Sequence, residues 1–291
     1  MTLQKTKTIM LVVAIICVLL AMLAALGAFV LPDKYGTVSV QQAASTKAIP
    51  AEEYEEPEPI VLGTATTSFS GSSLDRQHNI ALGAERVSSI TVAPGEEYSF
   101  LEHLGVVTEE VGYKEEYVIA YGSTRKEAGG GICQVSTTMF RAVVDAGLPV
   151  TQRHGHGYVV GYYGPGLDAT IYGPWRDLKW INDTEYPITV QSVVEGTDIN
   201  FSILGFPDGR TSTTTAVKFS DIQYPPKPVY ISDFSLELGK EWCTERAITG
   251  MTTEVTYTIE KSDGTVLEQL FETEYKPWGK KCYMGVKMPL K

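Results

Sequence analysis

The sequence predicts an α+β fold followed by a small all-β unit, and three features indicate this class. Apolar residues recur at helical spacing within 73–87 and again within 132–147. Beyond residue 185 the pattern changes to the alternation of strands, and turns at 195–196 and 262–264 each join two strand-like stretches into a hairpin. With 291 residues, 43% of them hydrophobic, the chain can bury a core and form two modest domains.

The second helix is the more clearly marked of the two. Its apolar residues fall at positions i, i+3, i+7, i+8 and i+11, namely Ile132, Val135, Met139, Phe140 and Val143. Three glycines, Gly129–Gly131, precede the helix and Gly147 provides a natural stop, so the chain is expected to turn sharply into the helix. We therefore expect a helix that is led by a glycine turn and packed with antiparallel strands.

The N-terminal segment predicts a membrane anchor. An uninterrupted apolar run of 23 residues, Ile9–Leu31, is long enough to cross a bilayer core of about 30 Å as a helix. Lys5 and Lys7 precede the run and glutamates follow it, so the positive-inside rule keeps the short tail in the cytoplasm. A cleaved signal peptide is the alternative, although its apolar core is usually shorter. We expect a single-pass protein of the cell membrane with an extracellular C-terminal part.

Composition divides the chain into four parts. Residues 1–32 form the cytoplasmic tail and anchor, and 33–60, rich in Pro and Glu, is typical of an extended linker. The globular part is expected to consist of a catalytic domain over 61–208 and a small β domain over 209–291. The formal charge of −11 leaves no basic stripe for phosphates, which argues against nucleic acid as a partner.

Cys133 is the candidate nucleophile, because it falls in the first turn of the second helix. Backbone N–H groups at a helix N-terminus carry partial positive charge, which stabilises a thiolate and lowers the pKa of a cysteine. The glycines permit close approach of a substrate and leave amides free to face a developing oxyanion. The candidate substrate contacts are Gly130, Gly131, Gln134, Ser136 and Thr137. The alternative is a buried, inert cysteine at a tight turn.

The cysteine count leaves Cys133 as the odd thiol. Cys17 lies in the apolar run, and Cys243 and Cys282 flank the second hairpin, whose strands can bring them within bridging distance. An extracytoplasmic site permits such a disulfide without requiring it. If the disulfide forms, Cys133 remains as a free thiol outside the cell, and a free thiol there calls for a chemical reason.

A nucleophilic thiol also needs a base, and the chain has four histidines. His154 and His156 are two residues apart, so on a strand both would point to the same face. Asp168 and Asp177 lie downstream, and either could orient an imidazole. A different chemistry fits the same residues, because two histidines, Cys133 and an aspartate could hold zinc with one open position. No C-x-x-C or H-E-x-x-H motif supports the zinc site.

Five motifs resemble the successive motifs of the VanW domain family of Gram-positive surface proteins: PGEEYSF, GVVTEEVGYKEEYVI, GGGICQVSTTMFRAVVDAGL, QRHGHGYVVGYYGPGLDATIYG and DLKWINDTEYPITV. The resemblance covers about 62–205 and associates the chain with peptidoglycan. Some members of the family resemble L,D-transpeptidases, which crosslink stem peptides, and use a cysteine nucleophile. The resemblance implies Cys133 as nucleophile and His156 or His154 as base. It also implies that Asp168 orients the base and that Arg153 is a substrate-binding residue of the site.

The chain departs from the family pattern at two positions. Leu101 stands where the family commonly has Asn, and Gly157 stands where it commonly has Ser. The expected function is acyl transfer between peptidoglycan stem peptides by a membrane-anchored cysteine L,D-transpeptidase, with no cofactor and no bound metal. The alternatives are a zinc-dependent peptidase, which metal analysis would reveal, and a non-catalytic wall-binding module, whose binding would survive loss of the thiol.

Overall fold

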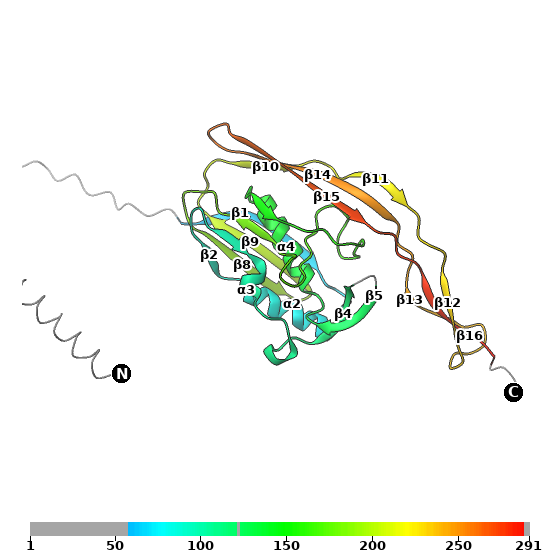
Figure 1. Ribbon diagram of the computed structural model, residues 1–291. Coiled ribbons are helices and arrows are strands. Elements are labelled where there is room, and N and C mark those ends of the chain that lie inside the picture. The colour runs from blue at the N-terminus through cyan, green and yellow to red at the C-terminus, as the bar shows by residue number, and fades with distance from the viewer. Residues whose placement is uncertain (1–57, 121–122, 288–291) are drawn as a thin grey trace, which may run out of the picture. The chain divides into compact units, whose positions relative to one another are not determined.

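The computed structural model describes residues 58–120 and 123–287, which all belong to one compact unit of the chain. The α+β class is confirmed, because the three α-helices among these residues pack with mostly antiparallel sheets (Figure 1). No helix in this part of the chain is long and apolar enough to cross a membrane. The predicted anchor, Ile9–Leu31, and the linker up to residue 57 lie outside the described residues.

A four-stranded antiparallel sheet and two helices form the first part of the fold. The strand order is β1 (Ile60–Ser68), β9 (Asp198–Gly205), β8 (Ile188–Glu195) and β2 (Ile90–Val92). Helix α4 (Ile132–Asp145) packs on β1 and β9, and α2 (Leu74–Arg86) packs against α4 and β8. The hairpin predicted around 195–196 is confirmed as the antiparallel pair β8–β9.

Both predicted helices form, and their ends have physical causes. The Ser73 side chain accepts a hydrogen bond from the Arg76 N–H group at 3.1 Å, which caps the N-terminus of α2. Helix α4 begins after Gly131, whose φ of 115° lies in the left-handed region that favours glycine. Gly147, with a φ of 72°, follows the end of α4 as the sequence predicts.

Several short elements of this part have no clear periodic signal in the sequence. β3 (Glu97–Ser99), β7 (Lys179–Ile181) and β6 (Val150–Gln152) form a three-stranded antiparallel sheet in this order. β4 (Glu115–Ala120) pairs with β5 (Ser123–Ala128), and helix α3 (Phe100–Leu104) and a 3₁₀ turn (Glu109–Val111) lie earlier in the chain. Strands of three residues are too short for alternation to reveal them.

The C-terminal part is all β, as predicted, and contains more strands than the expected hairpin. β14 (Gly250–Glu260) pairs along its length with β15 (Val266–Tyr275), which confirms the hairpin around 262–264. The other edge of β14 pairs with β10 (Thr211–Thr214) and β11 (Lys218–Gln223). The expected boundary at residue 208 lies in the connection between β9 and β10, and the division into two domains stays a prediction.

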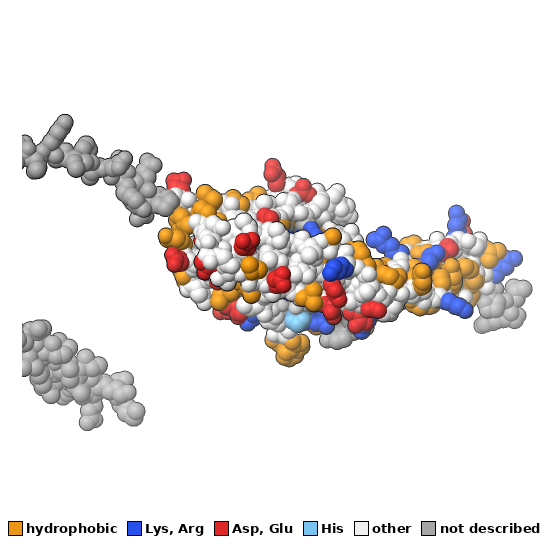
Figure 2. All heavy atoms as spheres, turned by 90° about the horizontal axis from the view of Figure 1, so that it is seen from above, with side chains coloured by type: hydrophobic (Ala, Val, Ile, Leu, Met, Phe, Trp, Pro, Cys, Tyr) orange, Lys and Arg blue, Asp and Glu red, His pale blue; other side chains and the backbone are white. Residues whose placement is uncertain are grey.

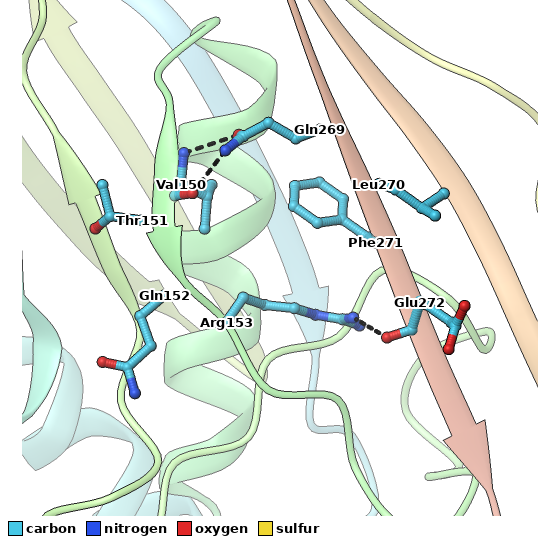
Figure 3. Close-up of a pocket in the computed structure, with 8 residues that line it drawn as sticks. All are labelled: Val150, Thr151, Gln152, Arg153, Gln269, Leu270, Phe271 and Glu272. Atoms are coloured by element: carbon cyan, nitrogen blue, oxygen red, sulfur yellow. Dashed lines mark hydrogen bonds between the residues drawn. The ribbon is translucent and has the colours of Figure 1, made fainter.

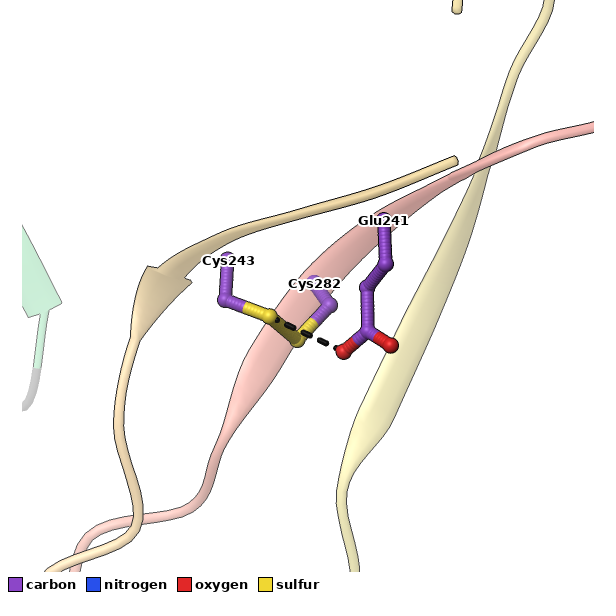
Figure 4. A group of neighbouring side chains, drawn as sticks. All are labelled: Glu241, Cys243 and Cys282. Carbon is purple, nitrogen blue, oxygen red and sulfur yellow. Dashed lines mark hydrogen bonds between the residues drawn. A yellow bond between two sulfur atoms is a disulfide. The ribbon is translucent and has the colours of Figure 1, made fainter. Parts of the chain in front are cut away.

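A second, three-stranded sheet contains the C-terminal disulfide. β12 (Val229–Asp233) and β13 (Glu241–Glu245) flank β16 (Lys281–Gly285), with β12 parallel and β13 antiparallel to it. Cys243 and Cys282 lie opposite one another in the β13–β16 register and form a disulfide, with Cα atoms 3.9 Å apart (Figure 4). Of the described cysteines, Cys133 is then the free thiol.

The hydrophobic core continues from α4 into the C-terminal hairpin. Phe140 of α4 packs edge-on against Phe271 of β15 with ring centroids 5.2 Å apart, and Phe271 stacks on Tyr257 of β14 at 5.6 Å. Val255, Tyr257 and Ile259, the alternating residues predicted to share one face, are all fully buried. Burying an apolar side chain of this size contributes about 1.5–3 kcal/mol, so this packing fixes β14 and β15 to α4.

Candidate functional site

Gly130 and Gly131 shape the turn that leads into α4. A Cβ at Gly131 would lie 2.9 Å from Ile80 and 3.1 Å from the side chain of Arg76. A Cβ at Gly130 would lie 2.8 Å from the side chain of Glu116. The absence of side chains at these two positions lets α2 and β4 approach the N-terminus of α4. In this arrangement the glycines have a packing role, whatever they contribute to a substrate.

Cys133 lies in the first turn of α4, and its thiol is half-buried. Its Sγ lies 3.4 Å from Thr170 Oγ1 and 3.6 Å from the carbonyl oxygen of Ile171. The sulfur also interacts with His156, which lowers the pKa of the thiol against the effect of burial. The Cys133 N–H group belongs to the first helical turn, where no earlier carbonyl of the helix can accept from it. The thiol therefore lies beside both an imidazole and a backbone donor that the helix leaves free.

His156 is held by Asp168 through two hydrogen bonds. The imidazole Nδ1 and the backbone N–H of His156 lie 2.5 Å and 2.7 Å from Asp168 Oδ2. Because Nδ1 is directed to the carboxylate, Nε2 is the ring nitrogen left for Cys133. The side chains of His156 and Asp168 are only 13% and 1% exposed. The three side chains thus have the arrangement in which nucleophilic catalysis places a nucleophile, a base and an orienting carboxylate.

Asp168 is held in turn by Arg153 and by strand β15. Arg153 Nη2 lies 3.2 Å from Asp168 Oδ1, and Arg153 Nη1 donates to the Thr273 hydroxyl of β15 at 2.8 Å. The hydroxyl of Tyr275, also on β15, donates to the same Oδ1 and accepts from Gly166 N–H at 2.8 Å. Arg153, which the family resemblance placed in the site, is therefore buried and stabilises the carboxylate of Asp168.

The three groups shift one another's pKa values. Burial alone would raise the pKa of the Cys133 thiol, but the hydrogen bond and charge of His156 outweigh burial and lower it. Burial alone would lower the pKa of His156, but its bonds with Asp168 and Cys133 raise it to about 9. Burial would raise the pKa of Asp168, but chiefly His156 and then Arg153 lower it to about 2. At neutral pH these directions favour thiolate, imidazolium and carboxylate.

Three side chains expected to contact a substrate instead hold α4 to its neighbours. Ser136 and Thr137 donate to the Ala169 carbonyl at 2.6 Å and 3.0 Å, and the Ala169 N–H donates back to Thr137 at 3.0 Å. The Gln134 amide donates to a hydroxyl and a carbonyl of β1. All three side chains are buried. They fix the segment that carries Asp168 along α4, and their polar groups face protein partners rather than a substrate.

His154 does not share a face with His156, because 153–157 is not a strand. His154 Nε2 lies 3.0 Å from the side-chain amide of Gln152 instead. The expectation of a strand here was wrong for a physical reason. At Gly155 a Cβ would lie 2.3 Å from a side chain of β15, so this segment bends closely around β15 and forms no ladder of its own. Of the two histidines, only His156 reaches the thiol.

Asp177, the other candidate carboxylate, serves a different element. It is buried, and its carboxylate accepts hydrogen bonds from the Ser99 hydroxyl at 2.6 Å and the Leu101 N–H at 2.9 Å. Both donors lie at the start of α3, so Asp177 stabilises that helix N-terminus. Leu101 contributes a backbone group there, and its departure from the family pattern leaves the Asp168 bonds unaffected.

Among the described residues, one group of metal-ligating side chains is compact enough to hold an ion, and it consists of Glu241, Cys243 and Cys282. Both of its sulfurs are joined in the disulfide, so neither is a thiolate (Figure 4). The zinc hypothesis required both histidines beside Cys133. Because His154 contacts the side-chain amide of Gln152, the ligand set of that hypothesis is incomplete.

Arg76 and Tyr162 complete the surroundings of the thiol, and sequence reasoning missed both. The Tyr162 hydroxyl lies 3.4 Å from His156 Nε2, and the Arg76 guanidinium lies over the Tyr162 ring at 5.3 Å from its centroid. Tyr275 was missed as well. In the sequence, Arg76 cannot be distinguished from an arginine on the exposed face of a helix. Tyr275 belongs to a strand that lies far along the chain from the motifs. Only the folded arrangement distinguishes them.

A pocket of about 190 Å³ lies between β6 and β15 (Figure 3). Its lining consists of Val150–Arg153 and Gln269–Glu272. The Gln269 side-chain amide bridges the backbone of Val150, accepting from N–H at 3.0 Å and donating to the carbonyl at 2.8 Å. Neither Cys133 nor His156 lines this pocket, so it is not the place where the thiol would meet a substrate.

Comparisons with known proteins agree with the motifs. A protein-family model described as "VanW like protein" matches residues 75–204. The "Uncharacterized protein YoaR" of Bacillus subtilis (strain 168) is 40% identical over 131 residues, which are 45% of this chain and 43% of that protein. The "Vancomycin B-type resistance protein VanW" of Enterococcus faecalis (strain ATCC 700802 / V583) is 29% identical over 152 residues, 50% of this chain and 54% of that protein. The chain spans about half the length of these relatives.

A solved structure titled "Crystal structure of HP0197-G5" also matches, with 25% identity over 25% of this chain and 97% of that one. Its TM-score of 0.14 is too low to carry an argument. Cys133, His156, Asp168 and Arg153 all lie within the matched residues 75–204, whereas β15 lies outside them. The family model, the two relatives and the motifs around these four residues agree, and residues 75–204 of this chain belong to the VanW-like family.

Proposed function

We propose that the protein is an extracytoplasmic cell-wall enzyme that transfers acyl groups between peptidoglycan stem peptides, with Cys133 as its nucleophile. The observation that carries the proposal is the grouping of Cys133 and His156, which shift one another's pKa values, with Asp168, which holds the His156 ring. The name of the Enterococcus relative, a vancomycin B-type resistance protein, supports a role at the cell wall. The apolar run Ile9–Leu31 supports a membrane anchor with the rest of the chain outside.

In the first half of the reaction, the Cys133 thiolate attacks the carbonyl carbon of the third residue of a stem peptide. The carbonyl oxygen becomes an oxyanion, which the Cys133 N–H group and the positive end of α4 stabilise. His156 Nε2 then donates its proton to the nitrogen of the scissile bond. The C–N bond breaks, the terminal D-residue leaves with a neutral amine, and a thioester remains on Cys133.

In the second half, the amine of another stem peptide attacks the thioester carbonyl. Neutral His156 accepts the proton of this amine, the C–S bond breaks and the thiolate of Cys133 returns. The product is an amide bond between two stem peptides. Asp168 keeps the imidazole oriented and stabilises its charged form, and it remains a carboxylate throughout.

The direct test is the mass of the full chain after incubation with a stem tetrapeptide. We expect an acyl adduct that maps to Cys133 and disappears when an acceptor peptide is added, together with a crosslinked product. Cys133→Ala should abolish the adduct and the product. Cys133→Ser keeps a smaller nucleophile at the same place and should form the adduct far more slowly, because a hydroxyl has to give up its proton during the attack whereas the thiolate has already lost it.

Three outcomes would overturn this proposal. Full activity of Cys133→Ala would show that the thiol is not the nucleophile. Activity that is lost with a chelator and restored by zinc would indicate a metal-dependent peptidase. Tight binding of peptidoglycan by wild type and Cys133→Ala alike, without any adduct or product, would indicate a wall-binding module.

A further inference from the structure

Arg76 carries a positive charge whose direct partners are neutral. Its Nη1 donates to the Ser72 hydroxyl at 2.9 Å, and its Nη2 donates to the side-chain carbonyl of Gln134 at 2.8 Å. Within 58–120 and 123–287, no carboxylate forms an ion pair with it. Glu116 is the carboxylate among the groups whose charge raises the pKa of Arg76. This carboxylate accepts a hydrogen bond from the Ser73 hydroxyl.

The guanidinium of Arg76 lies over a tyrosine whose hydroxyl faces His156. Because Gly131 has no side chain, the stem of Arg76 passes over the N-terminus of α4, 3.1 Å from where a Cβ would be. The guanidinium then lies over the ring of Tyr162, whose hydroxyl lies 3.4 Å from His156 Nε2. Burial lowers the pKa of Arg76, and the charge of Cys133 is the last of the groups that raise it. Arg76, Tyr162 and His156 thus form a continuous row of side chains.

A purely structural role does not explain why position 76 holds an arginine. A hydrogen bond to the Gln134 side-chain carbonyl needs one neutral N–H donor, and placing a charge in a half-buried position costs free energy. The guanidinium of an arginine presents five donors in a planar fork that matches a carboxylate. Two of those donors are used by Ser72 and Gln134, which leaves others for an anionic group that enters the site.

We propose that Arg76 is a substrate-binding residue that holds the free carboxylate of the C-terminal residue next to the scissile bond. This inference rests on the acyl transfer proposed above and narrows its substrate class. The preferred peptides end in a free carboxylate one residue beyond the carbonyl that Cys133 attacks. Peptides cleaved within the chain, or capped as a carboxamide, lack the group that Arg76 would hold.

The first test needs no peptide substrate. Iodoacetate and iodoacetamide alkylate the same thiolate, and they differ in that iodoacetate carries a carboxylate. The ratio of their rate constants at Cys133, mapped by peptide mass in the full chain, therefore cancels any change in the thiol pKa. We expect Arg76→Gln to lower the iodoacetate to iodoacetamide ratio about tenfold relative to wild type, since one unit charge near the sulfur is lost.

Two variants control this measurement. Arg76→Lys keeps the charge and should retain most of the wild-type ratio. Arg141→Gln removes an equivalent arginine, because Arg141 also lies over a tyrosine ring, that of Tyr163 at 5.0 Å, and donates to a backbone carbonyl. Its ratio should equal that of wild type. An unchanged ratio in Arg76→Gln, or an equal fall in Arg141→Gln, would overturn the proposal.

The second test uses peptides and separates this proposal from the acyl transfer itself. Stem tetrapeptides with a free C-terminal carboxylate and with a C-terminal carboxamide should differ in KM for wild type, and Arg76→Gln should remove the difference by raising KM for the carboxylate form. If both peptides acylate Cys133 equally, Arg76 does not hold the carboxylate. If the alkylation ratio changes as expected and neither peptide acylates Cys133, the anion site stands and the acyl transfer fails.

Discussion

The family-matched region 75–204 and the C-terminal strands differ in how they use their residues. The first region contains α4, most of whose side chains are buried, and it brings the candidate site residues Cys133, His156 and Asp168 together. The C-terminal strands leave many large hydrophobic side chains exposed, among them Phe219, Ile222, Tyr224, Val229, Tyr230, Phe234, Leu238 and Trp242. Figure 2 shows hydrophobic side chains gathered over this part of the surface. The first region contains the candidate site, whereas β12, β13 and β16 are joined by backbone pairing and a disulfide and bury few side chains.

Strand β15 is where the two regions meet. Its Tyr275 hydroxyl donates to Asp168, and its Thr273 hydroxyl accepts from Arg153. The matched region therefore contains Cys133, His156 and Asp168, to which we assign the catalytic roles, whereas a strand outside it contacts Asp168 directly and Arg153 beside it. The boundary of the family match is therefore not the boundary of the candidate site.

The largest expected effect separates the two histidines of the matched region. His156→Ala should slow acylation of Cys133 by about 10²–10⁴, the usual contribution of a positioned proton-transfer group. His154→Ala should leave the rate within about threefold, because His154 contacts Gln152 and not the thiol. Single-turnover rates with a stem tetrapeptide measure both. Equal losses in the two variants would contradict the assignment of His156 as the base.

These histidines also show how much of the site the sequence could predict. Cys133, His156 and Asp168 could be named because each lies in a motif, and the helix that carries Cys133 has an apolar pattern long enough to recognise. The shared face of His154 and His156 could not be predicted. It depended on a strand that does not form, because β15, about 120 residues later in the chain, occupies the space beside Gly155.

The fold shows the same limit. The helices α2 and α4 and the hairpins β8–β9 and β14–β15 are long and periodic, so local sequence predicts them. The three-residue strands β3, β6 and β7 depend on pairing with distant partners, which local sequence does not contain. The role of Tyr275 could not be predicted for the same reason, since it depends on the packing of β15 against Phe140 and the loop at Asp168.

The second prediction tests whether the disulfide matters to the site. Replacing Cys243 and Cys282 with serine opens a loop of sequence separation 39, which should lower the free energy of unfolding by roughly 4 kcal/mol. Urea unfolding under non-reducing conditions measures this loss. The alkylation rate of Cys133 in the folded variant should stay at the wild-type value, because none of the contacts around its sulfur come from β13 or β16. A slower rate would show that the disulfide region supports the site.

The third prediction concerns pH. His156 has a raised pKa of about 9, above its ordinary value near 6.5, so folding favours the imidazolium. Its contribution to stability is complete below about pH 6.5 and is lost as the pH rises through about 9. Acylation needs the same proton, so its rate should fall about tenfold per pH unit above that value. Asp168→Asn should move this alkaline limit to lower pH, because it removes a partner that raises the pKa.

The pH profile of Cys133 alkylation provides the matching control. Iodoacetamide needs only the thiolate, so labelling should persist on the alkaline side where acyl transfer is lost. On the acid side labelling should fall at a pH below the ordinary thiol value near 8.5, because His156 lowers the pKa of Cys133. Labelling that begins only above about pH 8.5 would contradict the ion pair.

The smallest expected effect is the most direct test of the link between the two regions. Tyr275→Phe removes one hydroxyl that donates to Asp168 and leaves the ring in place. Donors favour the charged form of a carboxylate, so the loss should raise the pKa of Asp168 above its present value of about 2. We expect acylation to slow about fivefold at neutral pH and the acid limit of activity to move to higher pH.

Tyr257→Phe is the matched control for this change. Tyr257 is equally buried on the neighbouring strand β14, and its hydroxyl donates to the carbonyl of Leu148, away from Asp168. Tyr257→Phe loses one buried hydroxyl bond, whereas Tyr275→Phe loses the bond to Asp168 and the one from the Gly166 N–H group. At about 0.5–1.5 kcal/mol for each bond, both variants should lose stability, and Tyr275→Phe should lose more. Only Tyr275→Phe should alter the acylation rate and its acid limit. If the two variants behave alike in the pH profile, β15 stabilises the fold without positioning Asp168, and the site would be complete within the family-matched region.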